Sequence, residues 1–171
     1  MAVKVGDKAI DFTLKDQHNK RLRLSELTRL RLPVPLARQT GANTHRQKGK
    51  KILLSFHPLA WTPVCSRQMK SLERKQTKFD KLNTIALGMS VDTVPSKKAW
   101  AKSLEIKNTR LLSDFWPHGG VAKLYGIFRA KDGFSERANI IIDEKGKVKF
   151  VKVYPLPQLP DIAEIIKVLE G

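Results

Sequence analysis

Hydrophobic and polar residues follow two periods along this chain, and the changes of period predict its elements. Residues 10–14 alternate between apolar and polar, and 21–24 alternate again after a polar turn. This pattern predicts an N-terminal β-hairpin within residues 3–27. Two mainly apolar runs, one beginning at Ile52 and one at 84–91, predict buried strands at 50–56 and 84–91.

Apolar residues at three- and four-residue spacing predict helices between and after the strands. The first helix is expected at about 63–82, with Pro63 in its first turn. A second helix holds Trp100 and Leu104. The last helix repeats apolar residues and ends near a glycine, in the series Leu159, Ile162, Ile165, Ile166, Leu169 and Gly171.

The order of these elements indicates the fold class. Strands and helices alternate in the first part of the chain, and an antiparallel pair at 137–143 and 148–153 precedes the closing helix. Such an order predicts an α/β fold with a mixed central sheet and helices on both faces. We expect one domain over residues 1–171, since a chain of 171 residues is long enough for one sizeable core.

Residues 28–49 interrupt the pattern. The stretch 28–47 contains no acidic residue, two prolines, one glycine and four arginines. It cannot bury much apolar surface, so we expect a long exposed loop inserted into the domain. Two interpretations stay open: a basic arm for an anionic partner, or a solvated insertion.

Charge and cysteine content limit the function classes. The formal net charge of +17 makes nucleic acid a partner to consider. The lysines are scattered among apolar residues, and one cysteine allows no zinc spacing, so nucleic-acid binding is not expected as the main function. A single cysteine also forms no internal disulfide, and no apolar run reaches membrane-span length. We therefore expect a cytoplasmic protein without a membrane partner.

The one thiol of the chain lies where a predicted strand meets a predicted helix. Cys65 is close to the N-terminus of the 63–82 helix, where backbone N–H groups and the helix dipole favour a thiolate. Thr62 is placed to hydrogen-bond the sulfur or a substrate oxygen. The candidate cationic partners are Arg67, Arg129 and Arg137. Spacing alone leaves a Cys–His pair open, with His57 as the nearest histidine in sequence.

The stretch Pro58-Leu59-Ala60-Trp61-Thr62-Pro63-Val64-Cys65 resembles the active-site loop of the peroxiredoxins, the alkyl hydroperoxide reductase and thiol-specific antioxidant family. The likeness covers nearly the whole chain except about 28–49. It includes the segments 5–12, 90–92 with Trp100, 112–114, 122–126, and 133–143.

This resemblance implies a thioredoxin-like fold and the reduction of hydroperoxides without a prosthetic cofactor or metal. It implies that Cys65 is the peroxidatic cysteine and that Thr62 and the Cys65 backbone N–H hold the peroxide oxygens. Arg137 would stabilise the thiolate and the leaving oxygen. Pro58 would shield the oxidised sulfur, and Gln68 would orient the arginine.

The chain departs from the family pattern in its cysteines. Lys70 stands where one branch of the family has a second, resolving cysteine. The chain therefore resembles a one-cysteine peroxiredoxin, recycled by an external thiol such as thioredoxin, glutaredoxin or a small thiol. The resemblance also implies a homo-oligomer, a dimer or larger. The alternative is a peroxide-responsive redox sensor or binding protein on the same fold.

Overall fold

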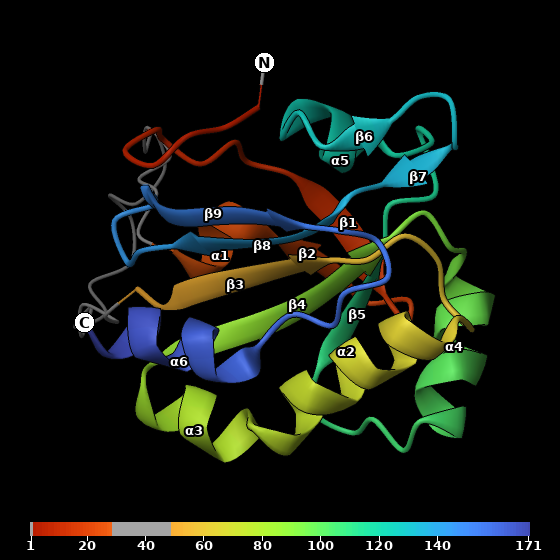
Figure 1. The fold of residues 1–171 in the computed structure, drawn as a ribbon, viewed down its shortest axis with the longest axis horizontal. Helices are drawn as coiled ribbons and strands as arrows, with labels where there is room; N and C mark the ends of the chain where they lie inside the picture. The colour runs from red at the N-terminus through yellow and green to blue at the C-terminus, as the bar shows by residue number, and fades with distance from the viewer. Residues whose placement is uncertain (1, 29–48) are drawn as a thin grey trace, which may run out of the picture.

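The computed structural model describes residues 2–28 and 49–171, and Figure 1 shows their arrangement. The strands are β1 Thr13–Asp16, β2 Arg21–Arg23, β3 Lys51–Phe56, β4 Thr84–Ser90, β5 Arg110–Ser113, β6 Phe128–Arg129, β7 Phe134–Ser135, β8 Arg137–Ile142 and β9 Val148–Tyr154. The helices are α1 Leu24–Leu27, α2 Pro63–Arg74, α3 Gln76–Lys81, α4 Val94–Ser103, α5 Gly120–Leu124 and α6 Ile162–Glu170.

Seven strands form the central sheet, in the order β2-β1-β5-β4-β3-β8-β9. The inner strands β3, β4 and β5 are parallel, whereas β1, β8 and β9 pair antiparallel with their neighbours. The mixed sheet is therefore as predicted. Residues 52–56 of β3 are all buried, which explains why this strand reads as a continuous apolar run.

Helices cover both faces of the sheet, as predicted (Figure 1). On one face α2, α3, α4 and α6 bury residues that include Met69, Phe79, Trp100 and Ile165. On the other face α5 and the N-terminal segment pack around Tyr125. Cys65 belongs to the first of these two cores, the one formed by α2, α3, α4 and α6. The thiol is therefore packed between α2 and the sheet.

A glycine lets α2 approach the sheet closely. A Cβ built on Gly88 of β4 would overlap Sδ of Met69, one turn beyond Cys65 on α2. Since Met69 Sδ lies at the far end of a flexible side chain, a larger residue at position 88 would force Met69 to repack against the sheet. Gly88 thus leaves the space beside the sheet that the Met69 side chain fills.

Two predicted helix boundaries were wrong. The helix expected at 63–82 is two helices, α2 and α3, which meet at Lys75. Apolar spacing continues across the break because Leu72 and Phe79 both face the core. The last helix begins at Ile162, because the Asp161 side chain accepts a hydrogen bond from the Ala163 N–H and caps the helix there.

The predicted basic insertion at 28–49 lies outside the described residues except for its two ends. The chain on either side of it is joined directly, since the Lys50 N–H donates to the Leu27 carbonyl at 3.0 Å. Among the described residues, none of the helices has both the length and the apolar composition needed to cross a membrane.

Candidate active site

The turn between β3 and α2 brings Cys65 to the end of the sheet. Thr62 has extended backbone angles and precedes Pro63, whose fixed φ suits the first helical position. Cys65 is the third residue of α2, and N–H groups in the first turn of a helix have no partner within that helix. The side chain of Cys65 is 1% exposed. The predicted strand-to-helix placement of the thiol is confirmed.

The Thr62 side chain does not cap the helix, although Thr62 occupies the cap position. Its hydroxyl donates to the Leu59 carbonyl at 2.9 Å. A hydroxyl has one proton and two lone pairs, so this bond leaves the oxygen able to accept. The Thr62 hydroxyl therefore keeps the capacity to accept a hydrogen bond, three residues before the thiol in sequence.

Arg137 is brought to Cys65 by strand pairing. It is the first residue of β8, and its neighbour Ala138 lies opposite Phe56, the last residue of β3. Its two terminal guanidinium nitrogens each lie 3.5 Å from the Cys65 sulfur, across 72 residues of sequence. The Arg137 residue is 3% exposed, so its charge acts in a dry environment.

A hydrogen-bond network holds the guanidinium in place. Arg137 Nη1 donates to Gln68 Oε1 at 2.5 Å, and Nε donates to the Leu156 carbonyl at 2.9 Å. The Gln68 amide donates in turn to the Ser55 hydroxyl and the Phe56 carbonyl, at 2.8 and 3.2 Å. These donor bonds require the amide oxygen to face Arg137.

Of the three candidate arginines, the structure brings only Arg137 to Cys65 within the described part of the chain. Arg129 pairs with Asp132 and Glu136, and Arg67 is exposed. No described carboxylate forms an ion pair with Arg137. Its positive charge is therefore available to the sulfur rather than neutralised by an acid.

Three further polar side chains around this turn were not found from sequence. Ser55 anchors Gln68, as described above, and Asp92 Oδ2 accepts from the Ala60 N–H at 2.8 Å. Lys97 reaches His57, the residue before the buried Pro58, with 3.1 Å between Nζ and Nε2. His57 does not hydrogen-bond the thiol, so no Cys–His pair forms among these residues.

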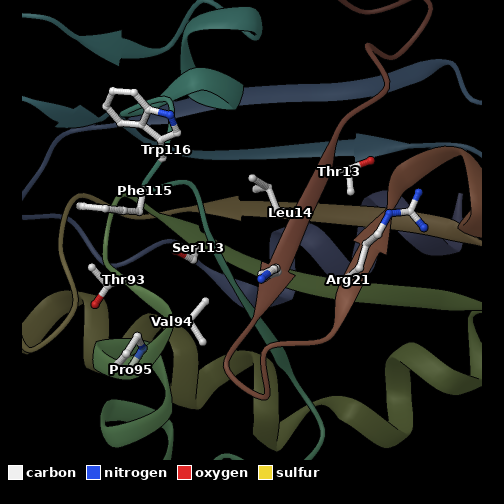
Figure 2. A pocket seen from close by; sticks show the side chains of 10 residues that line it. Thr13, Leu14, Arg21, Thr93, Val94, Pro95, Ser113, Phe115 and Trp116 are labelled. Carbon is white, nitrogen blue, oxygen red and sulfur yellow. The ribbon is translucent and has the colours of Figure 1, made fainter.

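A separate hollow of about 610 Å³ lies beside the β1–β2 hairpin and the start of α4 (Figure 2). Phe115 and Trp116, which follow β5, form part of its wall and are 47% and 79% exposed. None of the predicted site residues lines this hollow. Neither Cys65 nor Arg137 lines this hollow, so we do not assign it as the reactive site. The described residues also contain no group of three or more His, Cys, Asp or Glu side chains placed to hold a metal ion.

Comparison with known proteins agrees with this geometry. The chain is 35% identical over 149 residues to alkyl hydroperoxide reductase E of Mycobacterium tuberculosis, covering 87% of this chain and 84% of that protein. It is 37% identical over 125 residues to peroxiredoxin 2 of Sulfurisphaera tokodaii, covering 70% of this chain and 58% of that protein.

Solved structures extend the likeness to the fold. The reduced 2-Cys peroxiredoxin of Plasmodium vivax superposes with a TM-score of 0.79 at 26% identity, covering 98% of this chain and 81% of that one. The predicted thioredoxin-like fold is thereby confirmed. The AhpC/TSA family matches residues 32–151, and so the chain belongs to the AhpC/TSA family of peroxiredoxins.

Proposed function

We propose that this thiol-dependent peroxidase reduces hydrogen peroxide and organic hydroperoxides with Cys65 as the reacting thiol. The observation that carries the assignment is the double contact of the Arg137 guanidinium with the Cys65 sulfur, at 3.5 Å from each terminal nitrogen. Cleavage of an oxygen–oxygen bond needs alignment and charge stabilisation. A buried guanidinium that contacts the thiol and has no carboxylate partner among residues 2–28 and 49–171 supplies both.

In the first step the Cys65 thiolate attacks the terminal oxygen of the hydroperoxide. The sulfur–oxygen bond forms as the oxygen–oxygen bond breaks, and the leaving oxygen takes a proton to become water or an alcohol. Thr62 Oγ, already donating to Leu59, accepts from the peroxide O–H, and the Cys65 N–H donates to a peroxide oxygen. Arg137 stabilises the negative charge as it moves from sulfur to the leaving oxygen. Pro58, buried beside this turn, limits access of water to the sulfenic acid.

The recycling step needs a thiol from outside, because the sequence contains one cysteine. An external thiol attacks the sulfenic acid, giving a mixed disulfide and water. A second thiol then attacks the external sulfur of the mixed disulfide. Cys65 is released as a thiol, and the two external thiols leave joined as a disulfide. A thioredoxin, a glutaredoxin or a small thiol fits this role, and a reducing cytoplasm is the compartment we propose.

Replacing Cys65 with serine is expected to abolish peroxide consumption driven by any thiol donor, because a hydroxyl at this position does not ionise near neutral pH. The assay is peroxide loss with dithiothreitol, thioredoxin or glutaredoxin in turn. Stopped-flow mixing with hydrogen peroxide should show loss of the wild-type thiol far faster than that of free cysteine. A rate no faster than free cysteine would reject the assignment, whereas fast oxidation without turnover by any donor would favour the redox-sensor alternative.

We further propose that the protein is a homo-oligomer joined through the exposed Phe115–Trp116 segment (Figure 2). Two adjacent aromatic side chains beside an apolar hollow are the kind of surface that association buries. Trp116→Lys is expected to shift sedimentation velocity profiles toward the monomer. Leu124→Lys, at a residue that is 51% exposed on α5, is the matched control and should leave the profile unchanged. A wild-type protein that sediments as a monomer at high concentration would contradict the proposal.

A further inference from the structure

Lys97 is a lysine in the core of the molecule. It lies in the middle of α4 and is 0% exposed, on the same helix face as the buried Trp100 and Ala101. Lysines are almost never fully buried unless paired. Among the described residues no carboxylate lies within ion-pair distance of its Nζ atom. A carboxylate partner among the described residues therefore does not explain the burial of Lys97.

The partner of Lys97 is a second basic group. His57 is also 0% exposed, and its Nε2 lies 3.1 Å from Lys97 Nζ. Its other ring nitrogen, Nδ1, makes no hydrogen bond with the described residues. Two positive charges at this distance in a dry site are strongly unfavourable, so the pair carries at most one positive charge.

The surroundings of the pair place that positive charge on Lys97. Burial, Lys97 and Arg137 hold the pKa of His57 well below its usual range, against a smaller opposing effect of the Ser55 backbone. Burial lowers the pKa of Lys97 to about 7, while the negative charges of Asp92, Cys65 and Asp114 raise it. Lys97 is thus the cation of the pair near and below neutral pH.

Helix α4 is tied to the turn that carries the thiol. Trp100 Nε1 donates to the Ser66 hydroxyl at 3.3 Å, next to Cys65 on α2. Trp61 Nε1 donates to the Ser96 hydroxyl at 3.0 Å, next to Lys97 on α4. Lys97 Nζ itself lies 5.6 Å from the centre of the Trp100 ring. These contacts join the helix that carries Lys97 to the turn and to the start of the helix that carries Cys65.

We propose that Lys97, held by His57, is a positioning residue that stabilises the Cys65 thiolate electrostatically at neutral and mildly acidic pH. It acts together with Arg137 but without touching the substrate. His57, directly after β3, contacts it. The charges that act on Lys97 are those of Asp92 after β4, Cys65 on α2 and Asp114 after β5, and Arg137 acts on His57. The proposal deepens the peroxidase function and rests on Cys65 being the reacting thiol.

The first test is Lys97→Met, which removes the charge and keeps an unbranched side chain. The ionisation midpoint of Cys65, followed by thiolate absorbance, is expected to rise by about one pH unit. The rate with hydrogen peroxide should then fall about tenfold below the midpoint and little above it. Lys98→Met, at the next and exposed residue of α4, is the matched control and should change neither. An equal loss of rate at every pH, with the midpoint unchanged, would show a merely structural role and overturn the proposal.

The second test uses reciprocity and needs no peroxide chemistry. Electrostatic coupling between two sites acts equally in both directions. Side-chain NMR of lysine-labelled protein should therefore show Lys97 losing its proton at a lower pH in Cys65→Ser than in the wild type. An identical midpoint in the two proteins would overturn the coupling, even if Lys97→Met does not fold. A shifted midpoint together with a peroxide-inert Cys65 would instead retain the coupling and reject the proposed function.

Discussion

Replacing Arg137 with methionine is expected to slow the reaction of Cys65 with hydrogen peroxide by about 10² to 10³-fold. The guanidinium is the one cation within hydrogen-bond distance of the sulfur among the described residues. In the proposed mechanism, its removal withdraws stabilisation from the thiolate and from the leaving oxygen at once. The measurement is the second-order rate constant of thiol loss in stopped flow, over a range of pH.

Arg137→Lys is the informative control for this variant. It keeps the positive charge but loses the fork that contacts sulfur, Gln68 Oε1 and the Leu156 carbonyl together. We expect Arg137→Lys to recover only part of the lost rate, with normal thermal unfolding. A rate constant within about twofold of the wild type for Arg137→Met would show that the guanidinium contact is structural and not part of the chemistry.

The position of the thiol was predictable from sequence because its determinants are local. A continuous apolar run, a proline-rich turn and helical spacing occupy one uninterrupted stretch, and each element forms where the pattern indicates. The helix break at Lys75 was not predictable in this way. The apolar face continues through the break, and the spacing of apolar residues does not show where the backbone hydrogen bonds of one helix end and those of the next begin.

The partner of the thiol could not be chosen from spacing. Three arginines were candidates, and only the family resemblance singled out Arg137. What selects it physically is the antiparallel register of β3 and β8, which sets Phe56 opposite Ala138. Register depends on which strands become neighbours in the sheet, a long-range property that local sequence does not contain. Arg129, eight residues earlier in the sequence, instead forms ion pairs with Asp132 and Glu136.

Lys97 was missed for a different reason. It lies three residues before Trp100, on the same face of a helix, so helical spacing does place it toward the core. A lysine at such a position is ordinarily assigned to the surface, and the compensating group is a histidine 40 residues away in sequence. The helical spacing alone indicates that Lys97 faces the core. It indicates a Lys97–His57 pair only if His57 is also known to be buried.

Glu73→Gln is expected to destabilise the fold by about 2 kcal/mol at neutral pH. The Glu73 carboxylate, on the last turn of α2, accepts hydrogen bonds from the backbone N–H groups of Lys107, Asn108 and Thr109 and from two of their side chains. An amide keeps one acceptor oxygen but turns an NH₂ group toward the same donors. Chemical denaturation of the two proteins measures the difference. The matched control is Glu26→Gln, in a half-exposed ion pair with Arg21, which should cost less than about 1 kcal/mol.

The dependence on pH separates this carboxylate from a general effect of the substitution. Its hydrogen bonds outweigh the opposing effect of burial and lower the pKa of Glu73 from 4.5 to about 2. The unfolded chain therefore takes up the proton first as the pH falls. The stabilisation by Glu73 is complete above about pH 4.5 and is lost progressively toward pH 2. The stability gap between the wild type and Glu73→Gln should narrow over this window. A gap that stays constant would mean that the ionised carboxylate does not hold the 107–109 loop against α2, the helix whose other end carries Cys65.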